Sequence, residues 1–153
     1  ILKNIYKHKI IGWHHERRGG FLDKEVEASH FFRYTSTYWN GQLQPYQDVD
    51  GQYKSYLEDG YNDLFFKNIK SHTPHMGVWI TCFVALLHKD KDVNEFLNKW
   101  YLQTLKYTTQ DQIGFPYVCQ KTNLIPFTLP NEEIYGDHPH YSTMFYIKNN
   151  HGQ

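Results

Sequence analysis

The sequence is poor in cysteine, has no net charge and lacks a long hydrophobic run. Neither Cys82 nor Cys119 belongs to a Cys-x-x-Cys motif, which argues against a zinc knuckle or a redox pair. We expect both thiols to be reduced and buried, with one disulfide as the alternative. The 16 Lys and Arg residues balance the 16 Asp and Glu residues, so no net field attracts nucleic acid or anionic lipid. The longest apolar run, residues 82–87, is far shorter than the ~20 residues of a membrane-spanning helix.

Aromatic side chains are abundant instead, at 18% of the chain. Tyrosine and tryptophan can stack on sugar rings while offering a polar tip, but aromatic rings also fill cores. We expect the core to take most of Phe31, Phe32, Phe65, Phe66, Phe83, Phe96 and Trp100. A chain of 153 residues is long enough for one domain with a real core, and no repeat or domain boundary divides it. Because it begins at Ile1, without an initiator Met or a signal peptide, we expect it to be part of a longer protein.

Hydrophobic patterns predict an α/β domain. A short buried strand over 9–13 leads into two histidines and two arginines at its carboxyl end, and the apolar run over 76–87 is the best candidate for a central strand. Asn40-Gly41 is typical of a turn, and the tail after residue 118 is expected to be mostly loop. Helices are predicted over 23–34, 52–58 and 92–105, the last of these capped by Asp90 or Asp92.

Asp111 and Gln112 form the most informative feature, because this polar pair interrupts a helical pattern between aromatic residues. The β-branched pair Thr108-Thr109 ends the preceding helix, which places Asp111 at the head of a new short helix. Backbone N–H groups are unpaired there and favour an anion. The simpler interpretation, in which Asp111 only caps that helix, stays open.

Four blocks of the sequence stand out between about residues 9 and 118. They are His15 to Arg18 with Glu25 to Ala28, Gln52 to Gly60, Gly77 to Asp90, and Trp100-Tyr101 with Asp111 to Phe115. In this order they resemble the motifs of a glycosyltransferase family with the GT-A fold, whose members occur in plants, bacteria and large algal viruses. The family patterns are His-x-x-Arg with Glu-Ala-Glu-Ala, Gln-x-x-x-Tyr-x-x-x-Gly, a strand ending in Arg-x-His-Asn, and Trp-Trp followed by Arg-Asp-Gln-Leu-Ser-Phe.

The chain departs from the family pattern at several positions. Gln110 stands where the family usually has arginine, and Gly114 where it usually has serine. Glu16 lies inside the His-x-x-Arg block, and one extra residue separates this block from Glu25. These departures bear on donor preference and on activity.

The resemblance implies the acceptor-side half of a longer GT-A catalytic domain, which transfers a sugar from a nucleotide-sugar donor to a glycan or glycoconjugate acceptor. Asp111 and Gln112 would be catalytic, and whether the reaction inverts or retains stereochemistry stays open. Substrate contacts would come from His15, Arg17, Arg18, Gln52 and Trp100. The arginine pair is the right size to clamp one diphosphate. Glu25 and Glu27 lie on different sides of a helix, so they cannot act as one carboxylate pair. Either one of them orients a basic neighbour, or both belong to a solvated helix.

The expected metal is Mn²⁺ or Mg²⁺, with His138 and His140 as candidate ligands, since many GT-A enzymes use a late histidine. Asp48-Val49-Asp50 has the Asp-x-Asp pattern of GT-A metal sites but occupies the wrong place in the family order, so we expect a helix-capping loop there. The alternatives to a transferase are a non-catalytic carbohydrate-binding or assembly module and, from the histidine count alone, a zinc hydrolase. His72 and His75 are the other histidines in that count.

Overall fold

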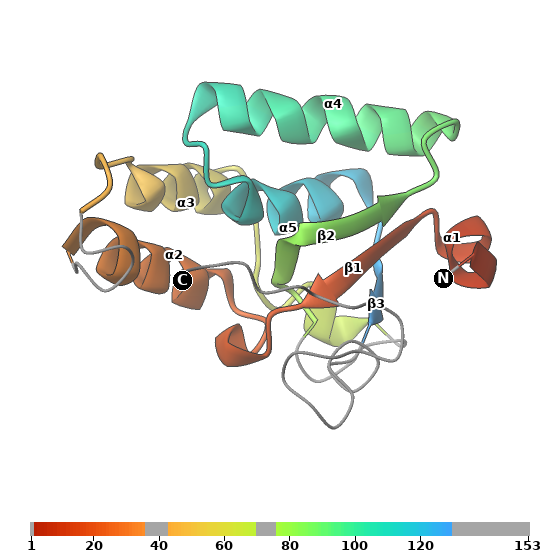
Figure 1. Cartoon of the computed structure of the whole chain (residues 1–153), viewed down its shortest axis with the longest axis horizontal. Helices are drawn as coiled ribbons and strands as arrows, with labels where there is room; N and C mark the ends of the chain where they lie inside the picture. Colours follow the sequence, from red (N-terminus) through yellow and green to blue (C-terminus); the bar gives the residue numbers. More distant parts are fainter. Residues whose placement is uncertain (1, 36–42, 70–75, 130–153) are drawn as a thin grey trace, which may run out of the picture.

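The computed structural model describes residues 2–35, 43–69 and 76–129, and this part of the chain is a mixed α/β structure (Figure 1). It contains a three-stranded mixed sheet, five α-helices, one π-helical segment and two short 3-10 turns. The strands are β1 (Ile10–His14), β2 (Trp79–Leu86) and β3 (Phe127–Leu129). The α-helices are α1 (Leu2–His8), α2 (Leu22–Ser29), α3 (Val49–Glu58), α4 (Lys91–Lys106) and α5 (Asp111–Thr122). The shorter segments are η1 (Glu16–Arg18), η2 (His30–Thr35, π-helical) and η3 (Phe66–Asn68).

The sheet has the order β2-β1-β3, with β1 antiparallel to β2 and parallel to β3. The predicted strand over 9–13 is therefore confirmed as β1, which is buried along its whole length. The prediction that 76–87 forms the central strand is wrong, because β2 lies at the edge of the sheet within the described residues. The apolar run reflects the packing of α5 on one face of β2, which does not require a second neighbouring strand, and most of β2 is only half-buried.

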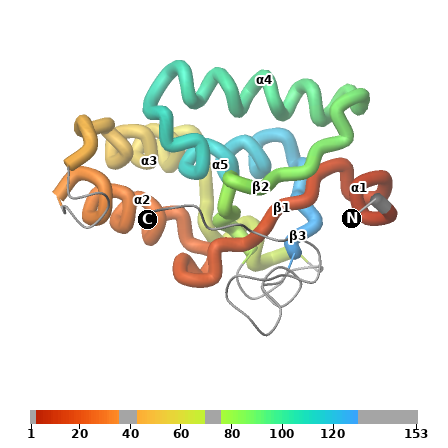
Figure 2. The backbone as a smooth tube through the Cα atoms, viewed as in Figure 1, coloured from red at the N-terminus to blue at the C-terminus, as the bar shows by residue number. Residues whose placement is uncertain are grey.

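Two helical layers lie on one side of the sheet. α5 packs on β2, and α4 lies outermost across α5 (Figure 1). The tube in Figure 2 shows α2 and α3 next to each other at one end of the molecule, with α1 at the other end. The core between the layers is aromatic: Trp79 contacts Phe115 at a ring distance of 5.6 Å, and Phe96 contacts Phe115 at 5.3 Å. The layering places the start of α5 directly over the first residues of β2.

Only some of the aromatic residues that we expected in the core are fully buried. Phe66 and Phe96 are fully buried, whereas Phe31 is 55% exposed. Cys119 is buried and its pKa is raised by burial, but Cys82 is exposed, so its predicted burial is wrong. Both cysteines are free, as expected.

The predicted helices are present with shifted ends. The helix expected over 23–34 is α2 continued by η2. α3 begins three residues early because Asp48 caps it, accepting a hydrogen bond from the Gly51 N–H at 2.9 Å. α4 begins after Asp90, whose side chain accepts from the Asp92 and Val93 N–H groups.

The end of the described chain differs from the expected loop. α5 is a full 12-residue helix that continues through Pro116. Part of the tail then adds strand β3 to the sheet. The predicted turn at Asn40-Gly41 lies outside the described residues.

Two glycines let β1 approach the start of β2 closely. A Cβ atom on Gly12 would lie 2.7 Å from Cδ1 of Trp79, which is too close for any other residue. Gly77 has φ +134°, and a Cβ there would lie 2.3 Å from the Gly20 carbonyl oxygen. This approach brings the turn after β1 against the residues that precede β2. Within the described residues, no helix is long and apolar enough to cross a membrane.

Candidate functional site

The Asp111–Gln112 turn is fixed to strand β2 through Thr81. The Thr81 hydroxyl donates to Asp111 Oδ1 at 3.0 Å, and the Thr81 N–H donates to Gln112 Oε1 at 3.3 Å. Asp111 remains exposed. The N-cap position of α5 belongs to Gln110, so the interpretation of Asp111 as the cap is wrong, whereas its place at the head of a helix is confirmed. Its carboxylate is oriented by a strand residue and lies at the positive end of the α5 dipole, where the Asp111 and Ile113 N–H groups already donate to the Thr109 and Gln110 carbonyls.

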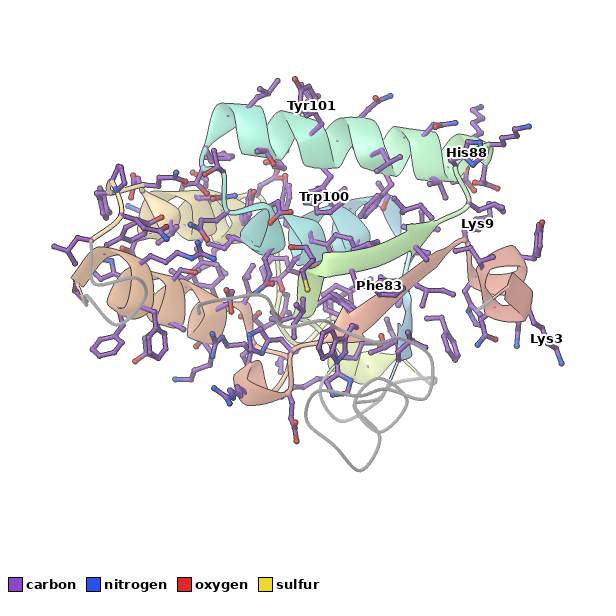
Figure 3. All side chains as sticks on the ribbon, in the orientation of Figure 1. Lys3, Lys9, Phe83, His88, Trp100 and Tyr101 are labelled. Carbon is purple, nitrogen blue, oxygen red and sulfur yellow. The ribbon has the colours of Figure 1, made fainter. Side chains whose placement is uncertain are left out.

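Trp100 fixes the same turn from the opposite side. Its indole N–H donates to the Asp111 carbonyl at 2.8 Å, and its ring packs on Phe115 at 4.9 Å. Figure 3 shows Trp100 directed from α4 toward α5, whereas Tyr101 points away from α5 and is 62% exposed. This half-buried position gives Trp100 a structural role, and its predicted contact with a substrate stays a prediction.

A buried network of hydrogen bonds holds Gln110, the residue that precedes the Asp111–Gln112 turn. Gln110 is 8% exposed and donates from Nε2 to the Tyr34 hydroxyl at 3.2 Å. Its backbone N–H donates to Thr108 Oγ1 at 3.2 Å, and the Thr108 hydroxyl donates to Gln52 Oε1 at 2.7 Å. Gln52 in turn donates to the Tyr56 hydroxyl at 2.7 Å. The network joins η2, α3 and the turn before α5.

Gln52 is only 1% exposed, and both ends of its side-chain amide bond to protein groups. These two hydrogen bonds satisfy the buried amide, so a structural role is enough to explain why glutamine occupies this position. Its predicted contact with substrate gains no support from this position.

Gly114, where the resembled family has serine, lies at the crossing of α4 and α5. A Cβ atom there would come within 3.2 Å of Gln103 Cβ and 3.6 Å of Trp100 Cδ1. The glycine therefore permits the close packing of the two helices that holds Trp100 against the turn.

A second polar cluster follows β1. Arg18 Nε donates to Glu25 Oε2 at 2.5 Å, and the Ser29 hydroxyl donates to Glu25 Oε1 at 3.3 Å. His15 Nε2 lies 3.9 Å from Glu25 Oε2. Glu25 is buried, so it needs these partners. The prediction that one glutamate orients a basic neighbour is confirmed for Glu25, whereas Glu27 is exposed and pairs with Lys24 at 3.4 Å.

The pKa of His15 is lowered from 6.5 to about 4, first by burial and then by the positive charges of Arg18 and Arg17. His15 is therefore neutral at pH 7 and can donate a hydrogen bond without bringing a positive charge to the site. Arg17 is exposed beside it.

The two clusters lie at the same end of the β1–β2 pair. His14 is paired with Trp79 in the sheet, and the His15 N–H donates to the Val78 carbonyl at 2.9 Å. Thr81, which holds Asp111, is three residues further along the chain than Val78. Thr81 was not among the predicted site residues. No motif marks it, since its role arises only from the packing of α5 on β2.

The Asp48-Val49-Asp50 triplet is used within the fold. Asp48 caps α3 and accepts a hydrogen bond from the Tyr46 hydroxyl at 3.3 Å, while Asp50 Oδ2 lies 3.2 Å from His30 Nδ1. The predicted capping role is confirmed. In residues 2–35, 43–69 and 76–129, no three His, Cys, Asp or Glu side chains form a group able to hold a metal ion. The other histidines considered as ligands, His72, His75, His138 and His140, lie outside the described residues.

Comparison with models of protein families, with curated proteins and with solved structures gave no significant match.

Proposed function

We propose that this chain is the acceptor-side part of a GT-A glycosyltransferase, which transfers a sugar from a nucleotide-sugar to a glycan or glycoconjugate hydroxyl. The proposal rests first on the four sequence blocks that resemble such enzymes. The observation that carries it further is the position of Asp111, an exposed carboxylate that Thr81 orients at the same end of the β1–β2 pair as His15 and Arg18. Diphosphate recognition and a reacting hydroxyl have to be brought together in such a reaction.

In this proposal Arg17 and Arg18 hold the diphosphate of the donor. Arg17 is exposed, and Arg18 bonds to Glu25 through Nε, so its remaining guanidinium N–H groups are the ones that would reach an oxyanion. His15, neutral at pH 7, would donate one hydrogen bond to a diphosphate oxygen without adding a positive charge. As the sugar leaves the donor, the growing negative charge on the diphosphate strengthens these contacts.

Asp111 is the residue closest to the chemistry in this proposal. In an inverting reaction its carboxylate accepts the proton of the acceptor hydroxyl while that oxygen bonds to the anomeric carbon and the diphosphate departs. In a retaining reaction Asp111 and Gln112 hold hydroxyls of the donor sugar. Thr81 and Trp100 are positioning residues in either case, because they fix the side chain and the backbone of Asp111.

A divalent cation, Mn²⁺ or Mg²⁺, would neutralise the diphosphate of the donor. The described residues do not fit such an ion, because Asp48 is occupied as a helix cap and Asp50 faces His30. His138 and His140 stay candidate ligands outside the described residues. No step of the proposed mechanism therefore passes through the metal.

The second candidate is a non-catalytic carbohydrate-binding module derived from a transferase. The observation that favours it is Gln110, which stands in place of the family's arginine and is buried against Tyr34. The positive charge that the family has beside Asp111 is therefore missing.

Asp111→Asn tests the proposal in the intact protein. The change keeps the size of the side chain and its hydrogen bond to Thr81 but removes the charge. If Asp111 is the base or a donor-sugar anchor, transfer falls by at least ~10²-fold. Asp92→Asn is the matched control, since Asp92 is an exposed aspartate in the first turn of α4. Release of nucleotide from a panel of nucleotide-sugars with glycan acceptors measures the rate.

Near-normal transfer by Asp111→Asn removes the catalytic assignment. If the unmutated protein transfers no sugar to any acceptor, the binding module becomes the better description.

A further inference from the structure

Positive charge gathers at the end of the molecule where α1 lies. Residues 2–9, which form α1 and the residue after it, contain three lysines and no acidic residue. Residues 88–92, which lead from β2 into α4, add two lysines and two aspartates. Five lysines against two aspartates give these segments a net charge of +3, whereas the whole chain has none. Because salt screens charges beyond ~8–10 Å, this local excess decides which surface the end attracts.

Lys9 joins the two segments into one surface. Its Nζ lies 3.0 Å from Asp90 Oδ2 and donates to Asp92 Oδ2 at 2.5 Å. Figure 3 shows Lys3, Lys9 and His88 at the same end of the molecule. A single lysine therefore occupies both aspartates, and the other lysines of the two segments keep their charge for an outside partner.

Four lysines make up this remaining charge. All four are exposed, and among the described residues no carboxylate pairs with them: Lys3, Lys7, Lys89 and Lys91. A lysine ammonium on a long flexible stem can reach several positions on a charged surface. We call this set of four lysines, together with Tyr6, the basic end.

α1 presents its part of the basic end outward because its other side is fixed to the sheet. Ile5 is 7% exposed and belongs to the apolar cluster that includes Leu129 of β3. Lys3, Tyr6 and Lys7 are three and four residues apart, so they share the opposite, exposed face of the helix. Tyr6 is 74% exposed. Two ammonium groups beside an exposed ring with a polar tip are typical of a helix that lies at a membrane surface.

The residue types favour a lipid surface over a nucleic acid. Residues 2–9 and 88–92 contain no arginine, so the planar donors that bind a phosphate in a bidentate manner are absent from them. They offer only one tyrosine, whereas proteins that bind single strands stack successive bases on several rings. Diffuse attraction to anionic headgroups needs only lysines, each of which strengthens binding ~5-fold. We infer that the basic end binds the surface of an anionic membrane.

This surface goes beyond the proposed transfer, because it lies at the other end of the β1–β2 pair. Ile10 is paired with Leu86 near the basic end, and His14 is paired with Trp79 at the end where Asp111 lies. A protein held on a membrane through its basic end would therefore keep Asp111 on the side away from the lipid. Membrane binding of this kind is compatible with an enzyme and with a binding module.

Co-sedimentation of the intact protein with lipid vesicles tests the inference. Vesicles of phosphatidylcholine alone are compared with vesicles that contain ~30% phosphatidylserine, whose surface is negative. We expect binding to the second kind only. Raising the salt to ~0.5 M NaCl should release most of the bound protein, because the charges are then screened.

Variants locate the binding surface. Lys3→Gln combined with Lys7→Gln should weaken binding by ~25-fold, the product of two lysines. The matched control is Lys24→Gln combined with Lys54→Gln, which removes two exposed lysines from α2 and α3. The control should weaken binding by less than ~3-fold, since these lysines lie outside the basic end. Tyr6→Ser should weaken binding by ~3–10-fold without a change in charge, because the ring no longer enters the interface.

Lys89→Gln combined with Lys91→Gln should weaken binding as much as the α1 pair does. No effect of this change would show that the two segments do not act as one surface. Equal binding to neutral vesicles, no binding to anionic vesicles at low salt, or equal weakening by the control pair would each overturn the inference. Binding to duplex DNA or polyglutamate without binding to anionic vesicles would replace the membrane with another polyanion. No nucleotide-sugar is added, so failure here leaves the Asp111 test unaffected, and an inactive Asp111 leaves this test unaffected.

Discussion

The two polar clusters at one end of the β1–β2 pair differ in how much of their chemistry the fold already uses. The Arg18 guanidinium is paired with a buried Glu25, and His15 is held neutral by its surroundings. The Asp111 carboxylate, in contrast, is exposed and accepts a hydrogen bond from the Thr81 hydroxyl. Where a residue supports the fold, its substitution changes stability and binding together. Asp111 is the position at which the two effects can be separated.

Arg18→Ala should have the largest effect on stability. It leaves the Glu25 carboxylate buried without its closest cation, and breaking one side of a buried pair costs ~3–5 kcal/mol. Urea denaturation monitored by circular dichroism measures the change. Arg17→Ala is the matched control, since Arg17 is exposed, and it should change the unfolding free energy by less than ~0.5 kcal/mol.

Equal stability of the two arginine variants would show that the Glu25 pair does not support the fold. Because Arg18 is bonded to the buried Glu25, Arg18→Ala changes both stability and nucleotide-diphosphate affinity. Arg17→Ala changes only the affinity, so it is the variant that tests donor binding.

The pH dependence of stability should reveal His15. Its pKa is about 4 in the folded protein and 6.5 in its ordinary state, so between these values the unfolded chain binds the additional proton. Unfolding free energy therefore falls as the pH falls from 6.5 to 4, by at most ~3 kcal/mol. Denaturation midpoints across this range, compared between the unmutated protein and His15→Gln, measure the contribution. Parallel curves for the two proteins would contradict the assignment.

Gln52→Ala should destabilise the protein by ~1.5–3 kcal/mol, because it removes the acceptor of the buried Thr108 hydroxyl and the donor to the buried Tyr56 hydroxyl and opens a small cavity. Thermal unfolding measures the loss. Gln120→Ala is a suitable comparison, since Gln120 bonds to backbone groups near the surface. A similar small loss from both changes would remove the structural role assigned to the network.

Asp111→Asn should have the smallest effect on stability, below ~1 kcal/mol, since asparagine can still accept from Thr81 and only the interaction of the charge with the helix N-terminus is lost. The melting temperature measures this. A loss as large as that of Gln52→Ala would place Asp111 with the structural residues and would weaken the contrast between the clusters.

Much of the fold could be predicted because local rules decide it. The strand over 9–13 and the helix capped by Asp90 follow from apolar periodicity and capping chemistry. The place of β2 at the edge could not be predicted, because an apolar run of this length suits a central strand as well as an edge strand covered by helices. The exposure of Phe31 and Cys82 has the same cause: residue type gives a tendency toward burial, and packing decides each case.

For the candidate site, the polar residue types were visible in the sequence, but their partners were not. Glu25 could be expected to orient a basic neighbour, yet its choice of Arg18 and its burial depend on the turn after β1. Thr81 and Tyr34 carry no motif and belong to the site region only through contacts 30 and 76 residues away in the chain. Pairings over such separations are set by tertiary structure.

Two features of the site region follow from local sequence: a helix begins at Asp111, and Asp48 caps another, because capping and helix termination depend on a few neighbouring residues. Three others depend on the packing of distant segments: Thr81 holds Asp111, Gln52 is buried and bonded to Thr108, and Tyr56 packs against Tyr107 and Tyr117. The reason is physical: a side chain's own chemistry sets what it can bond, but its partner and its access to solvent depend on how distant segments pack.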